Sequence, residues 1–272
     1  MNLNAWAFDW QGHRGARGLF PENSLEGMRE ALKYPITTLE FDVIVSQDQK
    51  VLLSHEPWLG EEACLNLEGK EVKEKEINLY KFKYDEIKKF DCGSKKHPRF
   101  LEQKKIKIHK PLLSDVLTQI EAEYAARKIF YNIEIKSTPQ DELEGFQPSV
   151  SVFTDLVVAA IKAHLPEDRF FIQSFDFRVL AYLNKNYPTI QTVALIEENL
   201  PQELVLKQLG FKPTVFSPYF KFLNKMNVTQ WQKLGVKVIP WTVNDLQDLK
   251  RVKALGVDGI ITDYPDRITK VK

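Results

Sequence analysis

Short apolar, β-rich runs alternate with helical patterns along nearly the whole chain of 272 residues. Most of these runs are continuously apolar, as strands buried on both faces of a parallel sheet should be. Repeated strand–helix units predict a parallel α/β sheet, and eight of them predict a closed TIM (β/α)8 barrel. An open doubly wound sheet is the structural alternative. The expected strands lie at Ala5–Gly12, Thr38–Val45, Ile129–Ile135, Phe170–Ser174, Thr192–Ile196, Val215–Pro218, Lys237–Thr242 and Gly259–Thr262.

The helical patterns between these strands carry recognisable start and stop signals. Asn23, with Glu26 three residues later, is expected to cap the first helix as a capping-box pair. Gly210, Gly235 and Gly256 directly follow three helices, where a C-cap favours positive φ. The expected helices are Ser24–Tyr34, Leu112–Arg127, Ser149–His164, Asp176–Asn186, Gln202–Leu209, Lys225–Leu234 and Asn244–Leu255.

One region, residues 56–110, interrupts the alternation because it contains no clear barrel strand. Val51–His55, just before it, is expected to return as an extra hairpin strand. From residue 70 to residue 107, thirteen Lys/Arg face seven Asp/Glu, a local excess of six positive charges. We expect residues 1–272 to form a single barrel domain with 56–110 as an insertion over the carboxyl ends of the strands. The insertion is either a solvated basic surface or a basic rim that attracts an anionic substrate.

The composition of the chain limits the classes of binding partner and the cellular compartment that we expect. The net charge is +1, which gives no overall case for nucleic-acid binding. No signal peptide and no apolar run of about 18 residues is visible, so no membrane span is expected. Cys64 and Cys92 are expected to be free thiols in a reducing compartment. These features favour a cytoplasmic protein, although an exported mature form would look the same, and the oligomeric state is not readable.

Acidic residues cluster where apolar strands end. Side chains alternate along a strand, so Glu40 and Asp42 face the same way, as do Glu134 and Lys136. In a barrel these faces meet at the mouth, where three converging carboxylates need protons or a cation. Oxygen ligands alone suit one hard divalent ion, Mg²⁺ or Ca²⁺. The alternative is that the acids pair with Lys136 or Arg14.

Two of the five histidines, His13 and His55, adjoin this acidic set. Cleavage of a phosphodiester requires an activated nucleophile and a protonated leaving group, and two histidines can supply both. Arg14 can grip a phosphate with two parallel hydrogen bonds, and Lys136 can act as a point charge. His97, His109 and His164 are expected to be structural or solvated.

These residues and their order resemble the glycerophosphodiester phosphodiesterases. The resemblance covers nearly the whole chain, and the order and spacing of the motifs make it specific. It rests on His13-Arg14-Gly15, Pro21-Glu22-Asn23-Ser24, Glu40-Phe41-Asp42-Val43, His55, Glu134-Ile135-Lys136, Gln173-Ser174-Phe175, Trp241-Thr242-Val243-Asn244 and Gly259-Ile260-Ile261-Thr262-Asp263-Tyr264-Pro265.

The resemblance implies a TIM barrel with a small inserted subdomain after strand two. It also implies hydrolysis of glycerophosphodiesters to sn-glycerol 3-phosphate and an alcohol such as choline or ethanolamine, with or without a cyclic phosphate intermediate. The implied roles are metal ligation by Glu40, Asp42 and Glu134, general acid/base catalysis by His13 and His55, phosphate binding by Arg14 and Lys136, and contact with glycerol by Trp241.

Two positions depart from the family pattern. Glu56 follows His55 where the family commonly has Asp, and Ser24 replaces the usual Thr. One rival function is that of a phospholipase D acting on lysophospholipids or sphingomyelin, which would call for an apolar rim on the insertion. The stretch here is mostly charged, which favours a small soluble substrate. A second rival, a phosphodiester-binding module without catalysis, would lack a histidine or a metal ligand, and this chain lacks neither.

Overall fold

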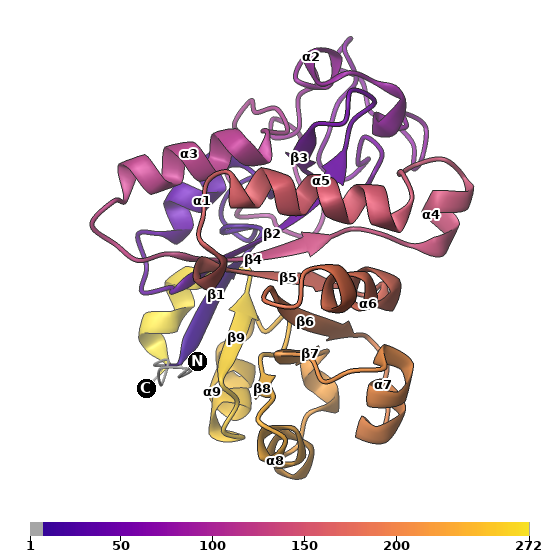
Figure 1. The fold of residues 1–272 in the computed structure, drawn as a ribbon. Coiled ribbons are helices and arrows are strands. Elements are labelled where there is room, and N and C mark those ends of the chain that lie inside the picture. The colour runs from indigo at the N-terminus through magenta and orange to yellow at the C-terminus, as the bar shows by residue number, and fades with distance from the viewer. Residues whose placement is uncertain (1–7, 272) are drawn as a thin grey trace.

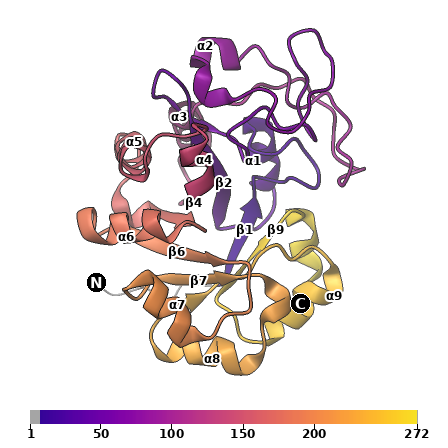
Figure 2. The same ribbon diagram turned by 90° about the vertical axis from the view of Figure 1, so that its right-hand side faces the viewer.

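The computed structural model describes residues 8–271. Its main element is a ring of parallel strands, with helices α1, α3 and α5–α9 on the outside (Figures 1 and 2). Neighbouring strands follow the order β8-β7-β6-β5-β4-β2-β1-β9. This nearly closed barrel confirms the TIM-barrel prediction and excludes the open doubly wound sheet. The strands are β1 Asp9–His13, β2 Thr38–Val45, β3 Val51–Leu53, β4 Phe130–Ile135, β5 Phe170–Ser174, β6 Gln191–Ile196, β7 Val215–Pro218, β8 Lys237–Val238 and β9 Gly259–Thr262.

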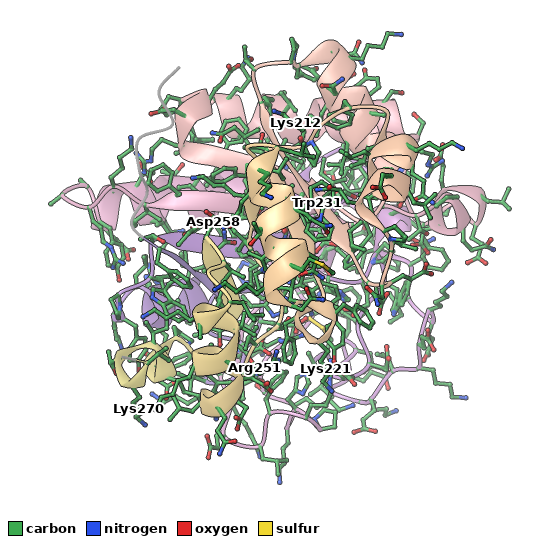
Figure 3. All side chains as sticks on the ribbon, turned by 90° about the horizontal axis from the view of Figure 1, so that it is seen from below. Lys212, Lys221, Trp231, Arg251, Asp258 and Lys270 are labelled. Atoms are coloured by element: carbon green, nitrogen blue, oxygen red, sulfur yellow. A yellow bond between two sulfur atoms is a disulfide. The ribbon has the colours of Figure 1, made fainter. Side chains whose placement is uncertain are left out.

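The barrel closes between β8 and β9 without a regular ladder. We expected a strand over Lys237–Thr242, but β8 ends after Val238, and Pro240 close behind it has no N–H to donate. Ile261 N donates to Pro240 O at 3.0 Å, and Asp258 N donates to Val238 O at 2.9 Å. The Asp258 carboxylate accepts a further bond of 2.8 Å from Val238 N (Figure 3). A few local bonds therefore seal the ring at this point.

The first strand and the first helix differ from their expected bounds. Residues Ala5–Ala7 of the expected first strand lie outside the described part of the chain, and β1 begins at Asp9. The expected capping box at Asn23 is wrong, because Ser24 caps α1 and accepts a 3.0 Å bond from Gly27 N. The helices are α1 Leu25–Ala31, α2 Tyr84–Ile87, α3 Leu113–Glu123, α4 Pro139–Leu143, α5 Val150–Lys162, α6 Phe177–Asn186, α7 Gln202–Leu209, α8 Lys225–Lys233 and α9 Leu246–Ala254, with short 3₁₀ turns at Leu79–Lys81, Glu167–Arg169, Phe220–Phe222 and Pro265–Lys270.

Apolar side chains fill two layers. The larger layer lies between strands and helices. There Trp231 of α8, labelled in Figure 3, stacks on Phe216 of β7 with ring centroids 4.2 Å apart. The inner layer fills the barrel itself with one residue each from five strands or strand extensions: Phe171, Val193, Val215, Ile239 and Ile261. None of the helices in the described part of the chain has the length and apolar character that a membrane crossing requires.

The chain leaves the barrel after β2. As expected, Val51–Leu53 returns antiparallel to β2 as strand β3. The stretch 56–110 follows with one short α-helix, α2, one 3₁₀ turn and irregular chain, at the top of Figure 1. It packs a small apolar core of its own, including Leu59, Leu79 and Ile87, against Ile44 of β2. This core fixes the stretch against the barrel, so that its polar residues are held near the strand ends.

The two cysteines are not free thiols, which corrects our expectation. Cys64 and Cys92 form a disulfide across 28 positions of the sequence, and both side chains are buried. The chain folds them together because Leu65 N donates to Asp91 O at 2.8 Å, which aligns the neighbouring segments. The cysteines therefore no longer support the expectation of a reducing compartment.

We expect the double variant Cys64→Ser/Cys92→Ser to lose about 2–4 kcal/mol of unfolding free energy, because the disulfide restricts the unfolded chain over a loop of this length. The measurement is urea unfolding under non-reducing conditions. Wild-type protein treated with a reductant is the control and should show a similar loss. Equal unfolding midpoints for oxidised and reduced wild type would contradict this expectation.

Candidate active site

The tight turn after β1 places the side chain and the backbone amide of Arg14 at the mouth of the barrel. Arg14 adopts a positive φ of 50°, and Gly15 follows with φ 85°. A Cβ at Gly15 would lie 2.6 Å from the backbone of Gly27, so only glycine fits there. The Arg14 amide then donates to Glu40 Oε2 at 2.9 Å. The tight turn thus joins β1 to the acidic residues of β2.

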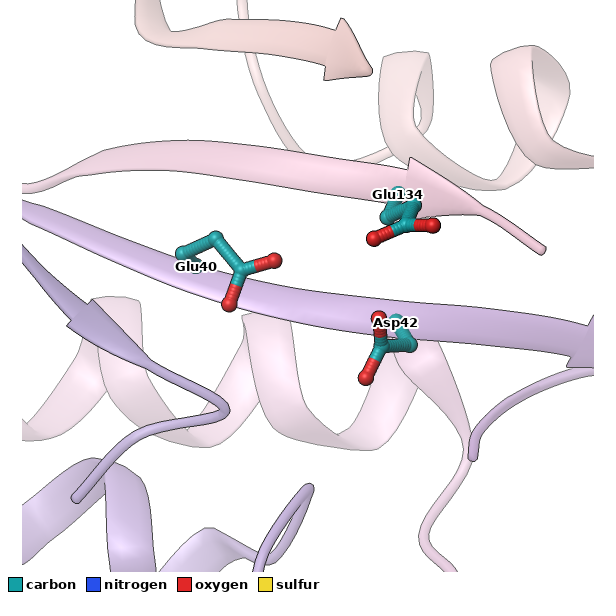
Figure 4. A group of neighbouring side chains, drawn as sticks. All are labelled: Glu40, Asp42 and Glu134. Carbon is teal, nitrogen blue, oxygen red and sulfur yellow. The ribbon is translucent and has the colours of Figure 1, made fainter. Parts of the chain in front are cut away.

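Glu40, Asp42 and Glu134 lie together, as the strand pattern predicted (Figure 4). One carboxylate oxygen from each lies within 4.8 Å of the others. This separation is about twice a metal–oxygen distance of roughly 2.0–2.6 Å, which is the spacing around a single Mg²⁺ or Ca²⁺ ion. All three residues are buried, so an ion here would be largely shielded from water.

The chemistry of this cluster fits a divalent cation. Asp42 Oδ1 is buried and has no hydrogen-bond partner within residues 8–271, so it is available as a ligand. Burial, with the charges of Asp42 and Glu134, holds the pKa of Glu40 well above its usual range. Burial also raises the pKa of Glu134 to about 7, although Lys136 opposes the shift. A bound cation would relieve both shifts by favouring the ionised carboxylates.

The ion pairs considered as an alternative also form, but they do not satisfy the whole cluster. Arg14 Nε lies 3.0 Å from Asp42 Oδ2, and Lys136 Nζ lies 2.7 Å from Glu134 Oε1. Burial opposes ionisation of Asp42, but Arg14 outweighs it and lowers the pKa of that carboxyl. Among the described residues, Glu40 has no lysine or arginine side chain within ion-pair distance, and the basic side chain that comes within 4.0 Å of it is His13, whose Nε2 lies at 3.9 Å.

His13 is held by a buried acid from the other end of the chain. Its Nδ1 lies 2.6 Å from Oδ1 of Asp263, the residue that directly follows β9. Arg17 donates to the same carboxylate at 2.8 and 3.1 Å. Burial and the Arg17 charge lower the pKa of His13 to about 4, so the ring is neutral near pH 7. With Nδ1–H donated to Asp263, the unprotonated Nε2 is on the side of Glu40.

His55 has a parallel arrangement from β3. Its Nδ1 lies 2.6 Å from Glu56 Oε1, and its Nε2 lies 3.0 Å from Lys136 Nζ. Burial, with the charges of Arg14 and Lys136, lowers the pKa of His55. The Glu56 that departs from the family pattern therefore still reaches the histidine ring. Lys136 donates toward Nε2, which leaves Nδ1–H for Glu56.

A cavity of about 310 Å³ at the strand ends joins these groups. It is lined by seven of the eight residues singled out from the sequence, while Asp42 belongs to the acidic cluster beside it. Trp241 lies just beyond β8, donates from Nε1 to Ser217 O at 2.9 Å and packs edge-on against Phe175. The lining residues are His13, Arg14, Arg17, Glu40, His55, Arg99, Glu134, Lys136, Gln173, Phe175, Leu195, Glu197, Trp241, Thr242 and Ile261.

Comparison with known proteins agrees with this arrangement. The sequence model of the glycerophosphoryl diester phosphodiesterase family matches residues 13–267. The chain belongs to this family. The resemblance inferred from the motifs is thereby confirmed, as is the expectation that the chain is an enzyme of the phosphodiesterase class.

Individual relatives match over almost the full length. A glycerophosphodiester phosphodiesterase of Caldanaerobacter subterraneus is 29% identical, with 94% of each chain covered. A crystal structure of a putative glycerophosphoryl diester phosphodiesterase from Silicibacter pomeroyi is 28% identical, with a TM-score of 0.86 over 97% of this chain and 93% of that one. An Oleispira antarctica phosphodiesterase in complex with the product sn-glycerol-3-phosphate is 23% identical, with a TM-score of 0.76 over 97% and 96% of the two chains, and shares the fold.

Within this phosphodiesterase fold, a chain of buried polar side chains reaches Glu40 of the acidic cluster from inside the barrel. Gln173 Nε2 donates to Glu40 Oε1 at 2.5 Å, and Asn132 Nδ2 bridges Gln173 and Gln11 with two bonds of 2.9 Å. Gln11 in turn donates to Asp9 at 2.7 Å. Because one Glu40 oxygen is fixed by Gln173 and the other by the Arg14 amide, this carboxylate is preorganised.

Several residues of this site had no role in it predicted from the sequence. Asp263 and Arg17 hold His13, Glu22 binds Arg14 at 3.0 Å, and Asn23 both donates to and accepts from Asp42. Asp263 could have been found, because it directly follows the last strand and so shares the polar edge with Glu40. Arg17 and Glu22 lie in a loop, where no spacing rule points to them.

We expect Asp263→Asn to lower kcat by about 10²–10³-fold, because an amide at this position no longer fixes the His13 tautomer with a free Nε2. Turnover of a glycerophosphodiester with saturating metal is the measurement. Asp245→Asn, the same change at the N-cap of α9, is the matched control and should leave kcat unchanged. A kcat within about twofold of wild type in Asp263→Asn would show that the carboxylate is dispensable.

Proposed function

We propose that this chain hydrolyses glycerophosphodiesters to sn-glycerol 3-phosphate and an alcohol, with one divalent cation and two histidines as general acid and base. The observation that carries the proposal is that His13 and His55 line one cavity together with Glu40 and Glu134, which form with the adjoining Asp42 a carboxylate cluster with room for one cation. Each Nδ1 is bonded to its own acid, so proton transfer falls to Nε2 of each ring, and Nε2 of His55 exchanges its contact with Lys136 Nζ for the reacting oxygen.

In this proposal the phosphoryl group lies between Arg14 and Lys136. A bound divalent cation, held by Glu40, Asp42 and Glu134, would polarise a phosphoryl oxygen as a Lewis acid. Arg14 and Lys136 neutralise charge that builds on the other phosphoryl oxygens. Both cations are preorganised, since Glu22 grips Arg14 and Glu134 anchors Lys136. Trp241 contributes an apolar wall against the glycerol carbons.

The proton transfers balance between the two rings. One histidine takes the proton of the attacking hydroxyl at its Nε2, while that oxygen forms a bond to phosphorus. The bond from phosphorus to the alcohol oxygen breaks, and this oxygen takes the Nε2 proton of the other histidine, which enters the step as the protonated imidazolium and leaves it neutral. The same pair serves whether water or the 2-hydroxyl of glycerol attacks first, because the roles reverse in a second step.

The test is a turnover panel with purified protein. Glycerophosphocholine, glycerophosphoethanolamine and glycerophosphoglycerol are incubated with EDTA, Mg²⁺ or Ca²⁺, and sn-glycerol 3-phosphate is measured by an enzyme-coupled assay. We expect turnover that EDTA abolishes and one of the two ions restores. Binding of a diester without metal-stimulated turnover would favour a binding module instead. Turnover of lysophospholipids alone would instead favour the rival function of a phospholipase D.

A further inference from the structure

The catalytic cavity has two differently charged sides, which follow from the order of strands around the ring. Phe175, Glu197 and Trp241 follow β5, β6 and β8 and lie on one arc. The stretch 56–110 extends from the β2 and β3 side and reaches the opposite arc at β1 and β9. A diester whose phosphorus lies near Lys136 therefore has one arm toward each side.

Arg99 is the residue through which the stretch 56–110 lines this cavity. Its backbone is fixed, because Arg99 N donates to the ring of buried His97 at 3.1 Å. The next residue, Phe100, is buried between Arg17, at 4.7 Å from its ring centroid, and Tyr264, at 6.3 Å. The Arg99 side chain is thus presented to the cavity from an anchored segment.

Among the cationic side chains that line the cavity, the Arg99 guanidinium can most readily exchange its present partner for a ligand. Arg14 and Arg17 are buried, Lys136 is half-buried, and each is paired with a buried acid. Arg99 pairs with Glu62 at 2.7 Å, but the two side chains are 58% and 41% exposed. Such a solvated pair contributes little, so an anionic ligand can replace Glu62 at small cost.

The charge around Arg99 strengthens this side as an anion site. Residues 95–107 carry six Lys/Arg and one Asp/Glu. On the opposite arc, no described lysine or arginine lies within ion-pair distance of the Glu197 carboxylate. The two arcs therefore differ in sign, and an arm of the substrate that carries negative charge is steered toward Arg99 and away from Glu197.

We infer that Arg99 binds an anionic group on the leaving alcohol, so that the preferred substrates are glycerophosphodiesters whose alcohol carries a carboxylate or a second phosphate. This inference rests on the proposed function, in which Trp241 contacts glycerol and the alcohol lies on the opposite side. Arg99 then acts as a specificity residue that selects the head group, while the phosphoryl chemistry stays with the deeper cations.

The test compares two substrates that differ only by a carboxylate, glycerophosphoserine and glycerophosphoethanolamine, through the same product assay. In wild type we expect kcat/KM for the serine diester to be about tenfold higher. Arg99→Glu should bring the ratio of the two values to one or below. Lys185→Glu is the matched control: it makes the same charge change at an exposed position in the last turn of α6 that does not line this cavity, and should keep the ratio within about twofold.

Three outcomes would overturn the inference while leaving the proposed function in place. These are equal kcat/KM for the two diesters in wild type, an equal loss with both diesters in Arg99→Glu, and the same change of ratio in Lys185→Glu. Thermal melts of each variant separate an unfolded protein from one that has lost selectivity, and Arg99→Gln supplies a milder change. Absence of turnover with every diester and metal would instead remove the proposed function, and the inference with it.

Discussion

His13→Ala and His55→Ala are each expected to lower kcat by about 10²–10⁴-fold while the fold and metal binding persist. Each substitution removes one Nε2 from the cavity and leaves the carboxylate cluster in place. His13 is neutral near pH 7 because burial and Arg17 lower its pKa to about 4. It is therefore better suited to act as the general base than as the general acid. Turnover with saturating metal is the measurement, and thermal melts establish that each variant folds.

His164→Ala is the matched control for these variants. His164 is exposed after α5, and its only side-chain contact among the described residues is Thr118 at 3.4 Å. The control should keep wild-type kcat. If either His13→Ala or His55→Ala also kept a near-normal kcat, the acid/base assignment for that residue would be wrong. A loss in only one of them would reduce the mechanism to a single histidine.

The affinity for Mg²⁺ or Ca²⁺ is expected to rise with pH up to about 7 and then to level off. The reason is that burial raises the pKa of Glu134 to about 7, so below that pH the carboxyl holds a proton that the ion must displace. Affinity should therefore fall by up to about tenfold for each pH unit below 7, and more if Glu40 also releases a proton. Isothermal titration at pH 6, 7 and 8 in two buffers counts the protons released.

Glu134→Gln tests the same site by removing one ligand. We expect the metal affinity to fall by more than about 100-fold, beyond the effect of changing a residue that only supports a ligand. Glu198→Gln, at an exposed position outside the cavity, should bind the ion as wild type does. A pH-independent affinity, or an unchanged affinity in Glu134→Gln, would show that the ion binds elsewhere.

Much of the fold and of the site could be predicted because it depends on local patterns. The continuously apolar runs identified all eight barrel strands, and the period of two in β2 placed Glu40 and Asp42 on one face. Contacts between distant segments were not predictable in this way. Asp263 reaches His13 across 250 positions only because β9 pairs with β1, and the disulfide depends on the path of an irregular segment.

The misplaced helix cap shows how function can override a local rule. Asn23 and Ser24 are both favourable N-cap residues, so the sequence alone does not choose between them. Asn23 instead adopts a φ of 52° and uses its amide on Asp42, with contacts of 2.9 and 3.1 Å. Ser24 caps the helix instead, because the side chain of Asn23 is hydrogen-bonded to the carboxylate of Asp42.

The incomplete seam between β8 and β9 has a consequence for how the barrel moves. Asp258 and a few main-chain bonds replace a full ladder there, whereas β2 and β4 pair over six residues. Backbone amides at the seam, such as those of Val238 and Ile261, should therefore exchange with deuterium faster than those of β2. Trp241 and Asp263 flank this joint, so transient opening of the ring would displace the wall of the cavity that carries Trp241 and the carboxylate that holds His13.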